Sequence, residues 1–494
     1  MRTIAGMRPL RRFRYVLLLV VLAAVVAAAT PADAQTLLRT LGTPNPQAYG
    51  LFGVSVAVGD VNGDRKGDVV VGAAQENGMQ GRAYVFSGTD GSLLFTLDAP
   101  NPQSTTCFGC YVAVGDVNGD QKGDIAVGSP QELTGGKREG RVYVFSGADG
   151  SLLLTLNDPD PQPAPPWGFF GSPVAVGDVN GDGKGEVAVG ATGQPVGGNS
   201  RQGRAYVFSG ADGSLLFTLD TPNPGPFRLF GSSLAVGDVN GDGEADIAVG
   251  AYGERRTYVF SGVDQLLLFT LNAPDPQVGV YFGWSVAVGD VNGDGKGDIA
   301  VGDYGESANG NSYQGRAYVF SGADGSLLRT LDTPNPQANA EFGYSLAVGD
   351  VNGDGKGDIV VGADGETVGG NTRQGRAYLF SGASGSVRFT LDTPNPQAYA
   401  YFGWSVAVGD VDGDGKGDIT VGAPLEDVGG NDQQGRAYVF SPPMGVGGIQ
   451  ALPDSAASSG DSSALPYVAL ACVAAAGVAA LGLGGWYVGR RQLR

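Results

Sequence analysis

Histidine is absent from all 494 residues of this sequence, and cysteine occurs only three times. Without histidine the chain cannot build a Ser-His-Asp or Cys-His catalytic site or a His-ligated zinc site, and it lacks the commonest general base. Three cysteines are too few for a disulfide scaffold or a four-thiolate zinc site. Basic residues are also scarce, since 31 Lys and Arg stand against 50 Asp and Glu; the formal net charge of −19 argues against nucleic-acid binding. The chemistry that remains is that of oxygen ligands.

Glycine and proline, by contrast, are abundant. The 85 Gly and 28 Pro make up about 23% of the chain, against a usual level of about 12%. In an unperiodic sequence this composition would indicate disorder, but 42% of the residues are hydrophobic and can form a core. The question is therefore whether the glycines recur in a pattern.

The N-terminal segment has the features of a secretory signal. Several arginines precede an apolar run over residues 15–29, and the small-x-small sequence Ala32-Asp33-Ala34 follows it. A basic head, an apolar middle and such a cleavage site predict a signal peptide over residues 1–34, with Gln35 as the first residue of the mature chain.

The C-terminal segment is predicted to be a membrane anchor. Residues 466–488 carry no charge, and as a helix they would extend about 34 Å, enough to cross a hydrocarbon core. We therefore predict a flexible stalk (442–464), a transmembrane helix (465–489) and a basic cytoplasmic tail (490–494), with the bulk of the protein extracytoplasmic at the plasma membrane. A sorting tail that a membrane protease cleaves is the alternative.

Between these segments the sequence repeats itself seven times. The motif Asp-Val-Asn/Asp-Gly-Asp begins at Asp60, Asp116, Asp178, Asp238, Asp290, Asp350 and Asp410, and a Phe-Gly pair stands eight residues before each. Each repeat contains four short runs rich in β-branched or aromatic residues, bounded by Gly, Asp or Pro. Such runs are typical of four antiparallel strands.

This periodicity predicts an all-β, seven-bladed β-propeller over residues 35–441. Four strands cannot bury both faces alone, and a radial array packs neighbouring repeats while leaving only short edges. Residues 36–41 match the fourth strand of a repeat but precede the first repeat, and the seventh repeat ends after its third strand. The N-terminal strand is therefore expected to complete the last blade and close the ring.

The acidic motif of each repeat predicts a calcium-binding loop. Oxygen-bearing side chains stand at positions 1, 3, 5 and 9, and position 7 offers its backbone carbonyl, a pattern that wraps one Ca²⁺. A two-residue hairpin turn would not need this nine-residue set. About seven Ca²⁺ sites are predicted. Their ligands are Asp60, Asn62, Asp64, Lys66 and Asp68; Asp116, Asn118, Asp120, Lys122 and Asp124; Asp178, Asn180, Asp182, Lys184 and Glu186; Asp238, Asn240, Asp242, Glu244 and Asp246; Asp290, Asn292, Asp294, Lys296 and Asp298; Asp350, Asn352, Asp354, Lys356 and Asp358; and Asp410, Asp412, Asp414, Lys416 and Asp418.

The loops are not identical. Arg65 and Gln121 replace the turn glycine at position 6, so the first two sites are expected to be weaker. Glu186 replaces Asp at position 9 of the third loop, and Asp412 replaces Asn at position 3 of the seventh.

Phe-Gly, the calcium-type loop and Gly-Ala-Pro, as in Gly422-Ala423-Pro424, resemble the FG-GAP repeats of the integrin α-subunit propeller and of bacterial surface proteins. The resemblance covers residues 36–441 and implies the propeller fold. All seven repeats carry the acidic loop, whereas integrins carry it on only some, and no leg domains follow. The resemblance therefore does not carry integrin biology over to this chain.

A partner is expected to bind the face that carries the Phe-Gly pairs and the loops between second and third strands. Aromatic residues flank Phe-Gly mainly in the later repeats, which makes Tyr281, Trp284, Tyr344, Tyr401 and Trp404 candidate partner-binding residues. In integrins the equivalent aromatics line the central opening and grip the partner subunit. Core packing is the alternative.

Two further features of this face leave alternatives open. An arginine opens the third strand of every repeat: Arg82, Arg141, Arg204, Arg256, Arg316, Arg376 and Arg436. They either pair with acids such as Glu254, Glu306, Glu366 and Glu426 or form an anion-binding ring. Cys107 and Cys110, which flank the second Phe-Gly, either pair across a tight bend or remain two free buried thiols.

These features predict a calcium-stabilised cell-surface module that binds or adheres to an extracellular protein or glycan, and not an enzyme. The near-identical repeats offer no singular catalytic constellation. Two alternatives stay open: a polysaccharide lyase built on a calcium propeller, and a structural surface-coat protein.

Overall fold

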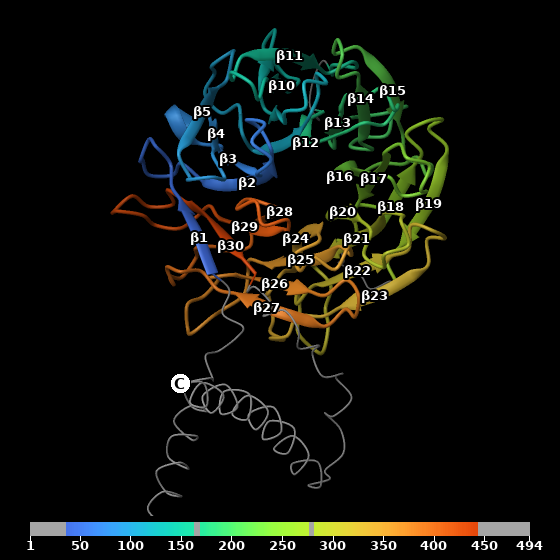
Figure 1. The fold of residues 1–494 in the computed structure, drawn as a ribbon. Coiled ribbons are helices and arrows are strands. Elements are labelled where there is room, and N and C mark those ends of the chain that lie inside the picture. Colours follow the sequence, from blue (N-terminus) through green and yellow to red (C-terminus); the bar gives the residue numbers. More distant parts are fainter. Residues whose placement is uncertain (1–35, 163–167, 276–280, 443–494) are drawn as a thin grey trace, which may run out of the picture. The chain divides into compact units, whose positions relative to one another are not determined.

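Seven four-stranded antiparallel sheets stand around a common axis in the computed structural model, which describes residues 36–162, 168–275 and 281–442 (Figure 1). The predicted all-β seven-bladed propeller is thereby confirmed. The predicted signal peptide, transmembrane helix and tail lie outside these residues, as does the stalk beyond Pro442. No helix within the described ranges is both long and apolar enough to cross a membrane.

Each blade is an antiparallel meander in which each successive strand lies farther from the axis than the one before it. The blades consist of β2 (Phe52–Gly59), β3 (Asp68–Ala73), β4 (Arg82–Phe86) and β5 (Leu93–Asp98); β6 (Tyr111–Gly115), β7 (Asp124–Ser129), β10 (Arg141–Phe145) and β11 (Leu152–Asn157); β12 (Phe170–Gly177), β13 (Glu186–Ala191), β14 (Arg204–Phe208) and β15 (Leu215–Leu219); β16 (Phe230–Gly237), β17 (Asp246–Ala251), β18 (Arg256–Phe260) and β19 (Leu267–Asn272); β20 (Ser285–Gly289), β21 (Asp298–Asp303), β22 (Arg316–Phe320) and β23 (Leu327–Leu331); β24 (Phe342–Gly349), β25 (Asp358–Ala363), β26 (Arg376–Phe380) and β27 (Val387–Leu391); and β28 (Ser405–Gly409), β29 (Asp418–Ala423), β30 (Arg436–Ser441) and β1 (Thr36–Leu41).

The N-terminal strand closes the ring as predicted. β1 pairs antiparallel with β30, so that Thr36 lies opposite Ser441 and Leu41 opposite Ala437. In Figure 1 this junction is where the blue start of the described chain meets its red end. The last blade is therefore assembled from both ends of the propeller sequence.

The core lies between neighbouring blades. The second strand of each blade is buried on both faces, as in β3, because a blade packs against each side of it. Phe52 is fully buried and contacts Tyr84 and Phe86 with ring centroids 5.9 and 6.0 Å apart. A Phe-Tyr-Phe cluster of this kind recurs in each of the seven blades. The repeated aromatics thus serve the interfaces between blades.

Steric crowding explains why the second residue of the Phe-Gly pair is glycine. Gly53 has φ of +94°, and a Cβ there would lie 2.3 Å from the carbonyl oxygen of Arg436 in the preceding blade. Only glycine allows this approach between two backbones. A parallel bridge between Phe52 and Gly435 follows from it.

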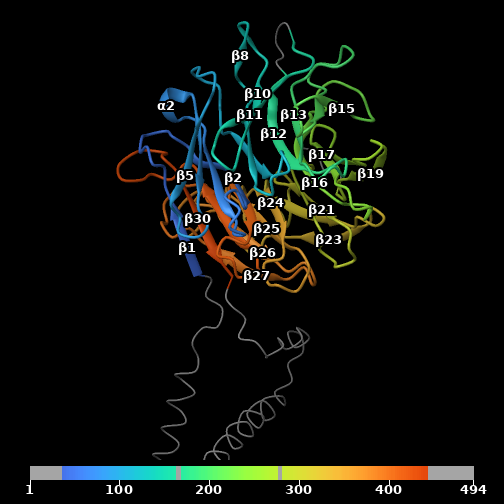
Figure 2. The same ribbon diagram turned by 45° about the horizontal axis from the view of Figure 1, so that its top comes forward.

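One end of the ring carries the Phe-Gly pairs together with the loops between second and third strands. Phe52 lies opposite Ala73, the last residue of β3, so these loops leave the sheet beside Phe-Gly. The short helix α2 (Glu76–Met79) and the hairpin of β8 (Leu133–Thr134) and β9 (Lys137–Arg138) belong to such loops. Figure 2 shows α2 and β8 rising from the same side of the ring. The acidic loops, which follow the first strands, lie at the other end.

Candidate functional site

Each acidic loop is organised by hydrogen bonds from its own backbone to its side-chain oxygens. In the fifth loop the Asp290 carboxylate accepts from the N–H groups of Gly293 (2.6 Å) and Gly295 (2.8 Å), and Asn292 Oδ1 accepts from Asp294 N (2.8 Å). Asp294 Oδ1 in turn accepts from Lys296 N at 3.0 Å. These contacts turn the side chains of positions 1, 3 and 5 inward over one another.

The position 9 carboxylate forms the buried floor of each loop. Asp298 is fully buried, and its Oδ2 accepts from the N–H groups of Val291 and Asn292 at 3.0 and 3.1 Å. Burial raises the pKa of Asp68 and Asp124 to about 6 and that of Glu186 to about 7. A bound cation would offset this desolvation by stabilising the charged form.

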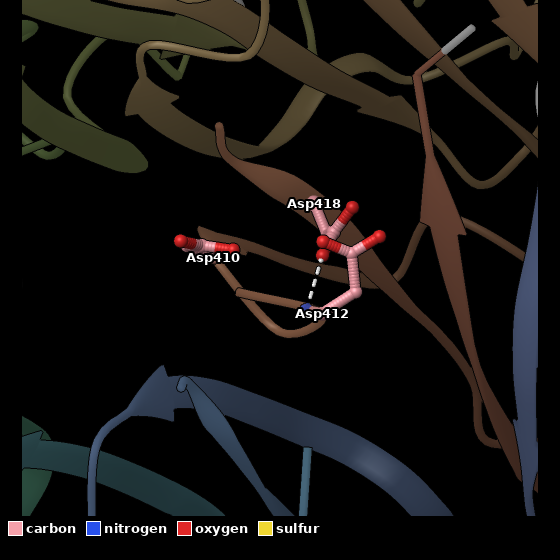
Figure 3. Close-up of side chains that lie close together, drawn as sticks. All are labelled: Asp410, Asp412 and Asp418. Atoms are coloured by element: carbon pink, nitrogen blue, oxygen red, sulfur yellow. Dashed lines mark hydrogen bonds between the residues drawn. The ribbon is translucent and has the colours of Figure 1, made fainter. Parts of the chain in front are cut away.

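The donor set of these loops fits a hard cation. Carboxylate and amide oxygens surround a small space, as Ca²⁺ prefers, whereas Mg²⁺ would keep more water. In the seventh loop one carboxylate oxygen from each of Asp410, Asp412 and Asp418 lies within 4.8 Å of the others (Figure 3). Asp418 Oδ1 is also buried without a hydrogen-bond partner among the described residues. A buried carboxylate with one unpaired oxygen, close to two further carboxylates, is an arrangement that a cation would satisfy.

The seven loops are joined in a closed circle. The N–H of position 8 in each loop donates to the position 1 carbonyl of the preceding blade, as Gly123 does to Asp60 (2.6 Å) and Gly297 to Asp238 (2.7 Å). The circle is completed by Gly67 of the first loop, whose N–H donates to the Asp410 carbonyl of the seventh at 2.5 Å. Each predicted cation site therefore contacts its neighbours.

Two loops contain strained backbone. Arg65 and Gln121 stand at position 6 with φ of +68° and +66°, a region that L-residues rarely adopt. The weaker binding expected of the first two loops is consistent with this strain and remains a prediction.

At the Phe-Gly end the ring encloses a cavity of about 420 Å³. Its wall is formed by the first residues of the first strands, and it is asymmetric. At the position after Phe-Gly, blades five, six and seven contribute Trp284, Tyr344 and Trp404, whereas blades one and two contribute the smaller Val54 and Cys110. Tyr111 of blade two, one position further along, also lines the cavity. Three large rings thus occupy one side of the cavity.

These rings belong to one continuous array, which we call the aromatic crescent and define as Tyr252, Tyr281, Trp284, Tyr304, Tyr344, Tyr401 and Trp404. Trp284 contacts Tyr344 with centroids 5.5 Å apart, and Tyr344 contacts Trp404 at 5.0 Å. Tyr281 stacks on Tyr304 at 4.7 Å. The five predicted aromatics are all half-buried, so they are neither fully inside the core nor free on the surface. Of the five, Tyr281 and Tyr401 support the crescent from behind, since they do not line the cavity.

An acidic cluster stands beside the crescent in blade six. Asp364 is fully buried, and neither carboxylate oxygen has a hydrogen-bond partner within the described ranges. Burial raises its pKa well above the usual range, and nearby Glu341 adds to the effect. Glu341 itself forms an ion pair with Arg373 at 3.0 Å. The Arg373 guanidinium also donates a hydrogen bond to the Tyr401 hydroxyl. Asp364 occupies the repeat position at which blades four and five carry Tyr252 and Tyr304.

The burial of Asp303, at the end of β21, should make the free energy of unfolding depend on pH. Asp303 is fully buried, its Oδ1 accepts from Tyr281 N at 2.7 Å, and burial raises its pKa to about 7. Because the folded state holds this proton more tightly than the unfolded chain, the stabilisation is complete below about pH 4 and is lost as the pH rises through 7. With Ca²⁺ saturating, Asp303→Asn should reduce the loss of unfolding free energy between pH 5 and 8 by about 2–3 kcal/mol.

Urea unfolding at the two pH values measures this difference. The control is Asp324→Asn, an exposed hairpin aspartate whose pKa is lowered by its hydrogen bond to Ser326, so it should not alter the slope in this range. The same slope in wild type and Asp303→Asn would contradict the assignment.

The arginines that open the third strands are ion-paired. Arg316 pairs with Glu306 (2.7 Å) and Asp332 (2.7 Å), and an equivalent pair is present at each of the seven positions, including those with Glu254, Glu366 and Glu426. The structural interpretation is therefore supported and the anion-binding ring is not. Cys107 and Cys110 form a disulfide with Cα atoms 5.4 Å apart, which decides between the two alternatives for these residues.

The sequence profile of the FG-GAP repeat matches residues 52–86, 112–145, 170–208, 230–263, 282–320, 342–380 and 402–440. The chain belongs to the FG-GAP repeat family. These seven FG-GAP repeats coincide with the seven blades, each match running from the first strand to the third.

Among characterised proteins, similarity is found to integrin α subunits. The chain is 34% identical to integrin alpha-5 of Xenopus laevis over 229 residues, which are 43% of this chain and 21% of the relative. It is 34% identical to human integrin alpha-IIb over 236 residues, 44% of this chain and 21% of the relative. A rat phosphatidylinositol-glycan-specific phospholipase D is 33% identical over 186 residues, 35% of this chain and 21% of the relative. The chain thus spans about a fifth of the length of each.

Sequence reasoning missed some residues of the FG-GAP blades. Tyr252 and Tyr304 belong to the aromatic crescent, and their signal was an aromatic residue after Val-Gly-Ala or Val-Gly-Asp in only two repeats. The buried tyrosine of each third strand was also missed as a polar partner. Tyr438 donates to Glu426 at 2.8 Å while Arg436 pairs with the same carboxylate at 3.2 Å. Two sequence patterns could have revealed this contact: a Glu four residues after Val-Gly, and a Tyr two residues after the Arg that opens the third strand.

Proposed function

We propose that this chain is a calcium-stabilised cell-surface module that binds or adheres to an extracellular protein or glycan. Ca²⁺ would occupy the acidic loops at one end of the ring, and the partner would bind at the cavity at the other end. The observation that carries the binding role is that the position after Phe-Gly holds a large ring in blades five to seven and a small or aliphatic residue in blades one to four.

The repeated loop geometry supports the role of calcium. Residues 1, 3, 5 and 9 of each loop supply carboxylate or amide oxygens, position 7 supplies its carbonyl, and the position 9 acid is buried. Desolvated carboxylates without a cation are costly to the fold, and an ion bound at each site would remove that cost. The proposed role of the ions is structural.

The asymmetry of the crescent supports a role in contact. A purely structural need would recur in every blade, whereas the equivalent positions of blades one and two carry Val54 and Cys110. Half-buried Trp and Tyr rings stack on sugar faces or hold a cationic group, and they are typical of binding sites. Arg373 already stands 5.4 Å from the centre of the Tyr401 ring, so the crescent accepts a guanidinium at its edge.

The cavity wall favours binding over the lyase alternative. Its serine hydroxyls hold neighbouring blades together, since Ser285 donates to the Gly343 carbonyl (2.8 Å) and Ser345 to that of Gly403 (2.7 Å). Turnover assays on acidic polysaccharides test the lyase alternative. A coat protein without a specific ligand would bind nothing in the experiment below.

Replacing Trp284 and Trp404 together by Leu should abolish partner binding. Leucine keeps apolar contact with Tyr304 and Tyr344 but removes the stacking surface, so calcium content should be unchanged and the melting temperature should fall by only a few degrees. Binding is measured on a glycan array and on a panel of basic extracellular proteins, with and without chelator.

The control is Tyr399→Ala, which removes an aromatic side chain that is 56% exposed and lies outside the cavity wall. Undiminished binding by the double variant would contradict the proposed site. A fall in melting temperature of about 10 °C or more would instead identify the rings as core.

A further inference from the structure

The seventh acidic loop is built differently from the other six at its buried floor. In the fifth loop, Asp298 Oδ1 accepts two hydrogen bonds, from Gly322 N at 3.0 Å and from Asn292 Nδ2 at 3.2 Å. Equivalent donors reach Asp68, from Gly88 N and Asn62 Nδ2. In these loops the protein itself compensates the inner oxygen of the position 9 carboxylate.

Both donors are missing in the seventh loop. Pro442 stands where the other blades have the glycine that follows Phe-Ser, and proline has no N–H. Asp412 stands where the other six loops have Asn, and a carboxylate cannot donate. The Ser441 hydroxyl donates to the Pro442 carbonyl. Asp418 Oδ1 is consequently buried without a hydrogen bond, although Asp418 Oδ2 keeps those from Val411 N and Asp412 N.

One of these substitutions, Asp412, also adds negative charge to the loop. Asp410, Asp412, Asp414 and Asp418 place four carboxylates at positions 1, 3, 5 and 9, where the other loops have three and an amide. Figure 3 shows the side chains of Asp410, Asp412 and Asp418 close together in the loop. A buried carboxylate that has one oxygen without a donor and lies close to like charges is destabilising until a cation binds. Among calcium loops, affinity rises with the number of charged ligands.

The seventh loop also lies at the junction between blades seven and one, where the first and last parts of the propeller sequence meet. Its Asp410 carbonyl accepts the hydrogen bond from Gly67 that completes the circle of loops. Asp418 begins β29, whose partner β30 holds the N-terminal strand β1 through the pairing of Thr36 with Ser441. An ion bound in this loop would therefore lie next to both junctions.

We propose that the seventh loop is the tightest divalent-cation site of the propeller and that its occupancy stabilises the junction between β1 and β30. This inference rests on the proposed calcium-binding role of the loops. The sixth loop provides a contrast, because Arg388 stands 3.7 Å from Asp358 and 3.8 Å from Asp354, where its guanidinium competes with a cation. The affinities therefore differ between adjacent blades.

Calcium titration of the full chain by isothermal calorimetry tests the affinity. Wild type should show one ion in a tight class followed by weaker sites. Asp412→Asn restores the residue of the other six loops, so the fold should tolerate it, and the tight ion should bind about tenfold or more weakly. The matched control is Asn292→Asp, which gives the fifth loop a fourth carboxylate and should tighten that site.

Hydrogen exchange at increasing Ca²⁺ tests the effect on closure. In wild type the amides of residues 36–41 should become protected at the lowest Ca²⁺ concentration, before those of the outer strands β15 and β23. In Asp412→Asn their protection should require the concentration that fills the weaker sites.

The outcomes separate this inference from the proposed function. If wild type binds several ions and Asp412→Asn leaves the tight class intact, or if residues 36–41 are protected no earlier than the other outer strands, the inference is overturned while the calcium role stands. If wild type binds no ion, both are overturned.

Discussion

Removal of divalent cations is expected to lower the melting temperature of this chain by roughly 10 °C. At a Kd near ~0.1 mM, about 1 mM Ca²⁺ contributes roughly 1.4 kcal/mol per site, so seven independent sites contribute about 10 kcal/mol. For a domain of this length that free energy corresponds to a shift of that order. The structural reason is that each loop buries an acid, such as Asp298, beneath two further carboxylates.

Differential scanning fluorimetry in excess chelator, in Ca²⁺ and in Mg²⁺ measures this effect. Mg²⁺ should restore less stability than Ca²⁺, because it requires near-ideal octahedral geometry and gives up its water reluctantly. Asp294→Ala removes one ligand and should lower the number of bound ions by one, with the destabilisation concentrated in its own and adjacent blades. Equal melting temperatures with chelator and with Ca²⁺ would contradict a structural role for calcium.

Deletion of residues 36–41 is expected to destabilise the propeller more than any surface substitution. The deletion removes the whole ladder with β30, uncovers a strand edge and exposes the core around Ala437 and Val439, against which Leu41 packs. An uncovered edge also favours pairing with other chains. Urea unfolding should show a loss of several kcal/mol, and light scattering should show association.

Two point variants in the same strand give this prediction a matched control. Leu41 is 4% exposed and Leu37 is 40% exposed. Leu41→Ala should cost about 2–5 kcal/mol, because it leaves a cavity between blades seven and one. Leu37→Ala should cost about 0.5 kcal/mol or less. Similar losses for both, or a deletion variant as stable as wild type, would indicate that the ring does not depend on this strand.

The sequence by itself determined the architecture of this protein, because the information for it is local and repeated. Short runs rich in β-branched or aromatic residues, glycine-bounded turns and the Phe-Gly pair recur in seven copies, and each copy specifies the same four-stranded blade. The displaced copy of a fourth strand at residues 36–41 was sufficient to predict closure with β30. The candidate calcium ligands followed from spacing within a single loop.

Only the tertiary structure decided which residues contact one another across and between blades. These contacts join residues that are far apart in the sequence, and no local pattern encodes such pairs. Tyr252 enters the crescent because blade four lies against Trp284 of blade five, and Tyr304 enters it because the end of β21 lies beside Trp284 within that blade. The circle of loops arises from backbone bonds between blades, such as that of Gly67 to Asp410. Asp418 loses its donor to a proline that follows the next strand of its blade, and the cost appears only because packing buries that carboxylate away from water.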